Sequence, residues 1–231
     1  MFKKTLGALL ASLALASILT SSASATSLPL FDETQHSLTE ADSIWVIANK
    51  KNPLNPLKYV PAELVKISKN NPYNLQLAKP AGVALVHLMN AAKTAGAGNI
   101  SIASGYRSYT RQKAVHADAV RKWGLSAGEK LAARPGFSEH QTGLAVDIYE
   151  PKQGCRIYTC FGKTKAGSWV KKNAWKYGFI VRYPDGESAT TGYQYEPWHL
   201  RFVGVELTTE MHSRGVTVLE KFWNYKPAPK Y

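Results

Sequence analysis

Hydrophobic residues recur along the chain at helical spacing in two segments. Over residues 78–95 the pattern is helical and stops at Gly96, and residues 112–123 have helical composition and end at Gly124. The expected buried face of the first segment carries Val83, Val86, Met89 and Ala92. The spacing therefore predicts two helices, each ended by glycine.

Other segments alternate or form short apolar runs, as strands do. An apolar run at 43–47 leads into a turn rich in proline, residues 99–103 alternate, and so do residues 144–148 and 199–203. In the third of these segments Asp147 projects from the face opposite Val146 and Ile148. The pattern therefore predicts strands in these four places.

A third helix is expected over residues 168–177, with Ser168 as N-cap and Gly178 as its stop. Strands and helices mix without regular strand–helix–strand alternation. This order favours an α+β fold in which a small antiparallel sheet carries the functional site and is flanked by helices.

The N-terminus has the pattern of a secretory signal peptide. Two lysines precede an apolar stretch that is too short for a membrane span of about 20 residues, and small residues stand at Ala23 and Ala25. We expect a signal peptide over 1–25, a flexible lead over 26–42 and one domain over 43–231. After removal of the signal peptide we expect an exported monomer without a membrane span, in the cell wall or periplasm of a bacterium.

Cysteine content and charge refine this picture. The two cysteines, Cys155 and Cys160, are close in sequence, and in an exported protein they favour a small disulfide loop. The formal net charge is +13. A basic exported protein is suited to anionic cell-wall polymers rather than nucleic acid, since the charges are scattered along the chain. A basic surface without a partner is the alternative.

The candidate chemistry lies in two short segments, Ser138–Asp147 and Glu196–His199. An isolated histidine such as His140 is usually structural, but Asp147 lies in an apolar strand, where an unpaired carboxylate is costly and calls for a cation. Gly143 between them allows close approach of the backbone. A catalytic zinc takes three ligands of this kind and keeps a position for water. We therefore predict that His140, Asp147 and His199 hold one Zn²⁺.

Glu196 is the candidate general base. Pro197 fixes the backbone after it, and a histidine three positions on can bind the ion while the carboxylate reaches a water. Considered alone, Glu196 could equally be an exposed residue in a loop, and His199 could be an ordinary histidine in a strand.

These segments, together with Ser-Gly-Tyr-Arg-Ser at 104–108, resemble the zinc D-alanyl-D-alanine carboxypeptidases of the VanY type over roughly residues 45–205. That family belongs to a wider group with lysostaphin-like endopeptidases and the hedgehog signalling domain. The resemblance implies zinc ligation by His140, Asp147 and His199, with Glu196 as base. It also implies that Arg107 stabilises the oxyanion or grips the substrate.

Arg107 also fits this role on physical grounds, because a guanidinium on a loop can pair with a carboxylate or a developing oxyanion. Gln112 and Ser138 resemble substrate-contacting positions of the family. Helix capping or turn hydrogen bonds would explain either residue equally well.

Other motifs give weaker signals. Ser168 and Lys171 fit the Ser-x-x-Lys pattern of serine enzymes that act on the same substrate, but the companion Ser-Asp-Asn and Lys-Thr-Gly elements are missing. The remaining histidines lack acidic or histidine partners at zinc spacing, and three tryptophans sit among helical apolar positions. We expect these histidines to be structural or exposed: His36, His87, His116 and His212. We expect these tryptophans to lie in the core: Trp123, Trp169 and Trp175.

The sequence thus predicts an exported zinc carboxypeptidase that removes a terminal D-alanine from peptidoglycan stem peptides. An L,D-carboxypeptidase or an endopeptidase would use the same chemistry on other bonds. A noncatalytic wall-binding protein with structural zinc and a basic polyanion-binding module are the alternatives from other classes. Glu196 argues against a purely structural site, which needs no spare carboxylate.

Overall fold

The structure is a computed structural model that describes Met1 and residues 31–231. The rest of the expected signal peptide and the first residues of the expected lead lie outside the described residues. The compact unit begins at Phe31, earlier than the expected start at Ser43. The Phe31 ring packs 5.5 Å from that of Trp45 and 5.9 Å from that of Phe222. Residues 31–42 are therefore packed rather than a flexible lead, because Phe31, Leu38 and Ala41 pack into hydrophobic clusters.

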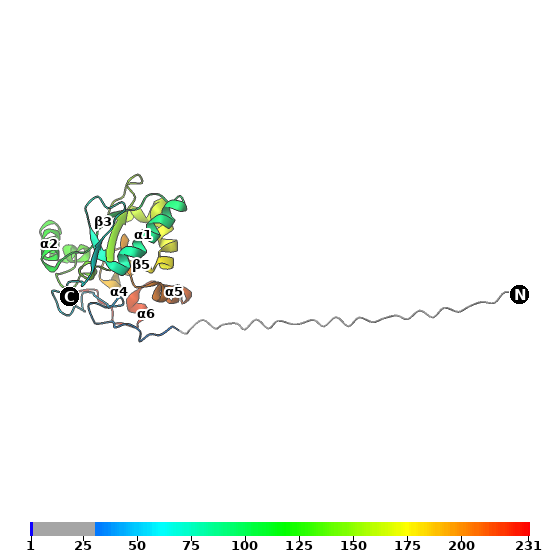
Figure 1. The fold of residues 1–231 in the computed structure, drawn as a ribbon. Helices are drawn as coiled ribbons and strands as arrows, with labels where there is room; N and C mark the ends of the chain where they lie inside the picture. Colours follow the sequence, from blue (N-terminus) through cyan, green and yellow to red (C-terminus); the bar gives the residue numbers. More distant parts are fainter. Residues whose placement is uncertain (2–30) are drawn as a thin grey trace. The chain divides into compact units, whose positions relative to one another are not determined.

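The described residues combine short strands with helices (Figure 1). The strands are β1 Leu64–Lys66, β2 Gln76–Ala78, β3 Ser101–Ser104, β4 Ala145–Tyr149, β5 Phe179–Tyr183 and β6 Glu196–Phe202. The α-helices are α1 Lys79–Thr94, α2 Tyr109–Leu131, α3 Lys165–Asn173, α4 Ser188–Thr191, α5 Val205–Ser213 and α6 Leu219–Phe222. The described residues also form the 3-10 helices η1 Glu139–Thr142, η2 Thr159–Lys163 and η3 Ala174–Tyr177.

The central sheet has the strand order β3-β4-β6-β5, and every neighbouring pair is antiparallel. β1 and β2 form a separate two-stranded sheet. In the central sheet Asp147 on β4 pairs directly with His199 on β6. The α+β prediction is confirmed, and the register alone brings two predicted zinc ligands together.

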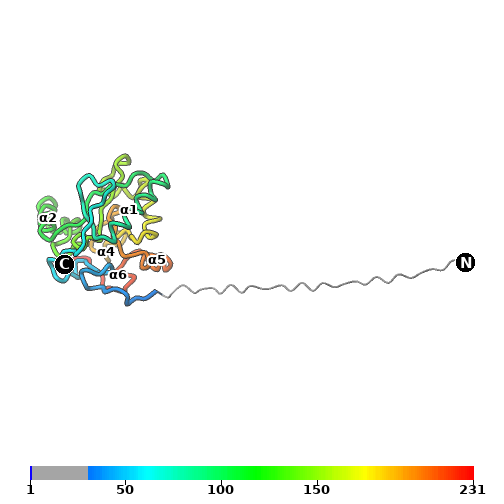
Figure 2. Tube along the Cα trace, viewed as in Figure 1, coloured from blue at the N-terminus to red at the C-terminus, as the bar shows by residue number. Residues whose placement is uncertain are grey.

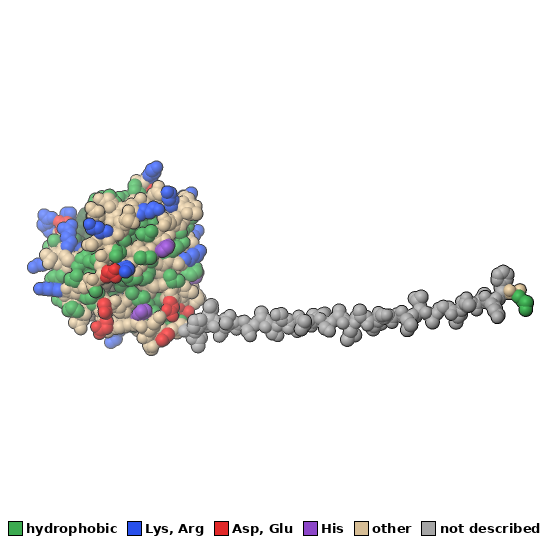
Figure 3. Space-filling view, in the orientation of Figure 1, with side chains coloured by type: hydrophobic (Ala, Val, Ile, Leu, Met, Phe, Trp, Pro, Cys, Tyr) green, Lys and Arg blue, Asp and Glu red, His purple; other side chains and the backbone are tan. Residues whose placement is uncertain are grey.

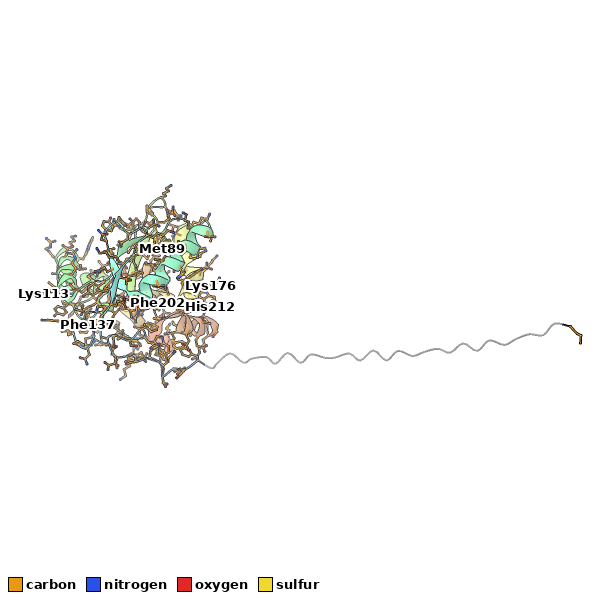
Figure 4. The ribbon with its side chains drawn as sticks, viewed as in Figure 1. Met89, Lys113, Phe137, Lys176, Phe202 and His212 are labelled. Carbon is orange, nitrogen blue, oxygen red and sulfur yellow. A yellow bond between two sulfur atoms is a disulfide. The ribbon has the colours of Figure 1, made fainter. Side chains whose placement is uncertain are left out.

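One face of the sheet forms the main core. Val146, Ile148 and Leu200 are fully buried there with residues of α1 such as Met89, which Figure 4 labels. The expected alternation in β4, with Asp147 on the opposite face, is confirmed.

The helix expected over 78–95 is α1, but its buried face differs from the prediction. Val83 is 52% exposed, whereas Leu85 and Leu88 are fully buried. Two overlapping faces of this helix are apolar, and both include Met89 and Ala92, so the sequence pattern alone could not show which face is buried. Packing against the sheet buries the face that carries Leu85 and Leu88.

The expected strand over 43–47 is wrong. This segment is irregular, although Trp45, Val46 and Ile47 are buried. Its backbone finds other partners, because the guanidinium of Arg201 donates to the carbonyls of Ile44 and Val46, each at 2.9 Å. A buried arginine therefore replaces the neighbouring strand that the apolar run would otherwise need.

α2 starts earlier and continues further than the predicted helix over 112–123. Ser108 caps it by accepting a hydrogen bond from the Arg111 backbone, and the chain kinks at Gly124, where φ is 75°. Figure 4 shows Lys113 on this helix at the outer edge of the protein. Trp123 next to the kink is 63% exposed, so its expected place in the core is wrong.

α3 begins at Lys165 and is capped by Thr164, whose hydroxyl accepts from the backbone of Gly167 at 3.0 Å. The predicted N-cap, Ser168, lies inside the helix, since the preceding turn is also helical. The helix continues as η3 and stops at Gly178, with φ of 78°, as expected.

Three further features complete the description of the folded unit: the position of its C-terminus, its disulfide and the hydrophobicity of its helices. Figure 2 shows the C-terminus near the blue-to-cyan part of the trace, and the ammonium of Lys50 lies over the ring of Tyr231. Cys155 and Cys160 form the expected disulfide. Among the described residues no helix is both long and apolar enough to span a membrane.

Candidate metal centre and active site

The three predicted zinc ligands meet at one end of the sheet. His140 comes from η1, Asp147 from β4 and His199 from β6, and one possible ligand atom from each lies within 4.8 Å of the others. All three side chains are at least nine-tenths buried. The arrangement follows from the sequence, since the β4–β6 register aligns two ligands and η1 leads directly into β4.

Close backbone contact brings η1 to the sheet. Gly143 ends η1 with φ of 70°, and its carbonyl accepts a hydrogen bond from the backbone of Ala78 at 2.9 Å. A Cβ at this position would lie 2.8 Å from that same nitrogen. The expected role of Gly143 in close approach is confirmed, because only glycine allows both the dihedral angle and the contact.

The imidazole of His140 is oriented for metal binding. Its Nδ1 lies 2.8 Å from the carbonyl oxygen of Gly105, which can only accept, so Nδ1 carries the proton. Its Nε2 is then a free base and lies 3.2 Å from Oδ2 of Asp147. Burial lowers the pKa of His140, and the nearby Arg107 lowers it further. The neutral imidazole that a metal requires is therefore the favoured form.

The imidazole of His199 is held between two carboxylates. Its Nδ1 lies 3.0 Å from Oδ1 of Asp147, and its Nε2 lies 3.6 Å from Oε2 of Glu139. Burial opposes the charged imidazolium, but the two carboxylates raise the pKa of His199 to about 9. The raised pKa favours the doubly protonated ring, so a metal held through Nδ1 would have to displace one of the two protons.

Glu139 belongs to a buried cluster of charges behind the site. One of its oxygens, Oε1, accepts from Arg182 at 2.7 Å and from Arg201 at 2.8 Å. Arg182 also donates twice to Glu220 on α6, at 2.7 and 3.0 Å. Burial alone would raise the pKa of Glu139, but the two guanidinium groups hold it far below its usual value. The cluster thus keeps a negative charge beside Nε2 of His199.

Sequence reasoning missed this cluster. Arginines at 182 and 201 within the apolar strands Phe179–Tyr183 and Glu196–Phe202 were the available signal, since a buried arginine needs an acidic partner. Glu139, between Ser138 and His140, is that partner.

Glu196 lies beside the ligands without being needed as one. Its Oε2 is 3.8 Å from Nδ1 of His199, and the residue is 7% exposed. It is the first residue of β6 rather than part of a loop, because the strand begins three residues before the predicted start. Burial raises the pKa of Glu196 to about 8, although the nearby His199 acts in the opposite direction. A carboxyl group with a raised pKa is suited to accept and return a proton.

Arg107 reaches the same centre from the loop after β3. Its guanidinium lies 3.9 Å from Asp147 and donates to Ser104 at 2.9 Å, while its backbone donates to the carbonyl of His140. Its other terminal nitrogen donates to the side-chain oxygen of Gln112 at 2.8 Å. The positive charge is therefore fixed at the edge of the site.

Gln112 lies behind Arg107, not in the cavity. It is fully buried, and its amide nitrogen donates to the carbonyl of Ala133 at 2.7 Å. Both ends of the amide are thus engaged by the protein. Gln112 therefore contacts Arg107 and Ala133 and does not line this cavity, and its expected contact with substrate stays a prediction.

A cavity of about 300 Å³ opens onto these groups. Ser138 lines it, as do Arg107, Glu196 and the ring of Tyr183, which packs 4.9 Å from that of His199. Ser168 does not line this cavity, and its hydroxyl faces the carbonyl of Gly162. The serine-enzyme alternative therefore has no support in the geometry.

The residues present fit a zinc ion. Each imidazole presents one nitrogen to the centre while the other faces a backbone carbonyl or a carboxylate, which is the usual support of zinc-bound histidine. The third donor, Asp147, has a pKa held well below its usual value by the two imidazoles, despite its burial. The donor set is therefore two histidines and one ionised carboxylate, as in catalytic zinc sites.

Comparison with known proteins agrees with this geometry. The model of the family "VanY: D-alanyl-D-alanine carboxypeptidase" matches residues 74–205. YodJ of Bacillus subtilis (strain 168) is 39% identical over 195 residues, which cover 80% of this chain and 69% of YodJ. The chain therefore belongs to the VanY D-alanyl-D-alanine carboxypeptidase family.

Solved structures are similar over most of the folded unit. The LdcB LD-carboxypeptidase superposes with a TM-score of 0.73 at 38% identity, covering 80% of this chain and 88% of LdcB. A mutant of the vancomycin-resistance D,D-pentapeptidase VanY in complex with Zn(II) superposes with a TM-score of 0.66 at 31% identity, covering 78% of this chain and 98% of VanY. The zinc prediction is thus supported both by the donor set and by a zinc-containing relative.

Proposed function

We propose that this chain is an exported zinc carboxypeptidase that removes the terminal D-alanine from peptidoglycan stem peptides, with Glu196 as general base. The observation that carries the proposal is a buried carboxyl group 3.8 Å from a zinc-ligand nitrogen, in a cavity that also presents an arginine. A structural zinc site needs neither group. A zinc ion held by His140, Asp147 and His199 would supply Lewis acidity and lower the pKa of a water.

Three side chains of the protein would perform proton transfer, charge stabilisation and positioning. Glu196 removes a proton from the attacking water, and the same carboxyl group returns it to the amine of the departing alanine. Its raised pKa suits this return, because the protonated form is accessible near neutral pH. Arg107 offers positive charge to a terminal carboxylate or to the oxyanion that develops. Gln112 keeps the guanidinium in place for either role.

A second candidate specificity is supported by the LdcB relative. LdcB is an LD-carboxypeptidase, and its identity to this chain, 38%, exceeds the 31% of the D,D-pentapeptidase VanY. Both activities hydrolyse the bond before a C-terminal D-alanine, and they differ in the residue on the amino side of that bond. The zinc ligands and Glu196 serve either reaction.

The test is product analysis of the purified mature protein on two stem peptides. A pentapeptide ending in D-Ala-D-Ala and a tetrapeptide ending in a single D-Ala are incubated with and without chelator. Chelator-sensitive loss of one alanine from the pentapeptide supports D,D specificity, and loss from the tetrapeptide supports L,D specificity. Failure to cleave either peptide with zinc bound would contradict carboxypeptidase action and favour an endopeptidase or a wall-binding protein.

Export and a role for the basic surface complete the proposal. The signal-peptide pattern over 1–25 supports export to the wall or periplasm. Figure 3 shows Lys and Arg side chains along several edges of the folded unit, including the edge formed by α2. We propose that this surface attracts anionic wall polymers and that the enzyme acts as a monomer. Binding to such polymers should weaken as the salt concentration rises.

A further inference from the structure

Two apolar side chains lie at the rim of the cavity that contains the metal centre. Leu131 is at the end of α2, and Ile157 is in the loop closed by the Cys155–Cys160 disulfide. Both side chains line the cavity, and each is 38% exposed. The disulfide loop is therefore part of the wall of the active-site cavity.

The backbone at Ile157 adopts an unfavourable conformation. Its φ is 54°, in the left-handed region that β-branched residues rarely occupy. Glycine or asparagine would adopt this conformation more easily. Ile157 is also more than one-third exposed, so its side chain is only partly buried.

Both flanks of Ile157 are fixed to the protein. The guanidinium of Arg156 lies 4.8 Å from the ring of Tyr73 and 4.9 Å from that of Tyr149, and it donates to the Tyr73 hydroxyl at 2.6 Å. On the other side the disulfide closes the loop just before Phe161, which is fully buried. These anchors hold Ile157 in its strained conformation, as surrounding structure does at functional sites.

We propose that the disulfide-closed loop, residues 155–160, holds Ile157 as a specificity-determining wall that contacts methyl-bearing side chains of the substrate peptide. This inference rests on the proposed function, because alanine residues of the stem supply those methyl groups. Apolar contact with a small side chain is enough to change kcat/KM by 10-fold or more. The loop lies outside the metal ligands, so it acts on substrate binding and leaves zinc binding unchanged.

The test compares Ile157→Gly with Val60→Gly on the preferred stem peptide. Val60 is a matched control, because it is exposed in a loop and does not line the cavity. For Ile157→Gly we expect KM to rise about 10-fold with little change in kcat. Zinc content should be unchanged, and the melting temperature should be unchanged or higher, because glycine relieves the positive φ. Val60→Gly should keep the KM of the unmodified protein.

A second variant, Cys155→Ala with Cys160→Ala, tests the role of the closed loop. This double variant should also raise KM, as Ile157→Gly does, while zinc stays bound. Opening the loop by mutation avoids thiol reductants, which would also bind zinc. An unchanged kcat/KM in Ile157→Gly, with normal turnover by the unmodified protein, overturns this inference alone. Absence of turnover by the unmodified zinc-loaded protein on any stem peptide instead overturns the proposed function and this inference with it.

Discussion

Oε2 of Glu139 lies 3.6 Å from Nε2 of His199, and neither atom has a hydrogen-bonding partner elsewhere among the described residues. In the described part of the chain, the two atoms therefore lie opposite each other in a buried site. A carboxylate at this position would keep the proton of His199 on Nε2 and leave Nδ1 free for a metal ion. Glu139 thus fixes the orientation and protonation of a predicted zinc ligand without itself belonging to the group of possible ligands.

Replacing Glu139 should weaken zinc binding. In Glu139→Gln the charge beside Nε2 of His199 is lost, and supporting groups of this kind contribute about 10- to 100-fold in metal affinity. The same change leaves Arg182 and Arg201 without the negative charge that they share, although an acceptor oxygen remains, and this should destabilise the fold by up to about 3–5 kcal/mol. Zinc affinity by competition with a chromogenic chelator and thermal melting measure the two effects. Wild-type zinc affinity in a folded Glu139→Gln protein would contradict this role.

Glu196→Gln should separate chemistry from metal binding. We expect kcat to fall by about 100- to 10,000-fold, because the amide cannot accept the proton of the water. Zinc should remain at one equivalent, since His140, Asp147 and His199 are intact. Turnover assays with metal analysis of the same sample check both expectations. Substantial turnover by the zinc-loaded variant would remove Glu196 as the base.

His140→Ala should release the metal. The variant removes one of three donors, so we expect zinc to be lost on dialysis and turnover to disappear. His87→Ala is the matched control, because His87 is exposed and lies outside the cluster of possible ligands. Metal analysis after dialysis compares the two variants. Equal zinc content in both would show that His140 is not a ligand.

Gln112→Leu should lower activity through Arg107. The change removes the acceptor that lies 2.8 Å from the guanidinium, so the charge is no longer fixed, and kcat/KM should fall by about 10- to 100-fold. Zinc content should not change. Gln112→Glu keeps an acceptor for Arg107 and should retain more activity than the leucine variant. If both variants lose activity equally, Gln112 does not act by holding Arg107.

The free energy of unfolding should decrease at acidic pH, in part because Glu220 becomes protonated. Burial alone would raise its pKa, but Arg182 and the hydrogen bond from Asn49 lower it below the ordinary value of 4.5. A lowered pKa in the folded state means that the unfolded state binds the proton more tightly. The stabilisation is therefore complete above about pH 4.5 and is lost as the pH falls through the lowered folded-state pKa.

The variant Glu220→Gln should be less stable at neutral pH, and its stability should change less on acidification. The exposed Glu206→Gln is a matched control and should behave like the unmodified protein. Denaturant unfolding at a series of pH values measures both. Parallel pH profiles for Glu220→Gln and the unmodified protein would show that this carboxylate does not contribute the dependence.

Much of the site could be predicted from sequence because its residues lie in short, regular segments. Alternation in 144–148 places Asp147 opposite Val146, and the structure confirms this arrangement. The strand pairing that aligns Asp147 with His199 is a long-range contact, so local spacing could not give it. The resemblance to the VanY family supplied that link.

Other features depended on tertiary contacts that local patterns do not encode. The segment around Trp45 is apolar like a strand, but Arg201 satisfies its carbonyls and no strand forms there. β5 was not predicted, and its Arg182 has meaning only beside Glu139 and Glu220. Likewise, the hydrogen bond from Arg107 to Gln112 depends on the packing of α2 against the loop after β3, which local sequence patterns do not show.

The most direct test of the central claim is the mass of the products from a stem pentapeptide treated with metal-depleted, zinc-reloaded and reloaded Glu196→Gln protein. We predict loss of one C-terminal alanine from the peptide with the reloaded protein, and an intact peptide with the other two samples. If the metal-depleted protein or the reloaded Glu196→Gln protein released alanine at the rate of the reloaded protein, the zinc and Glu196 mechanism would be contradicted.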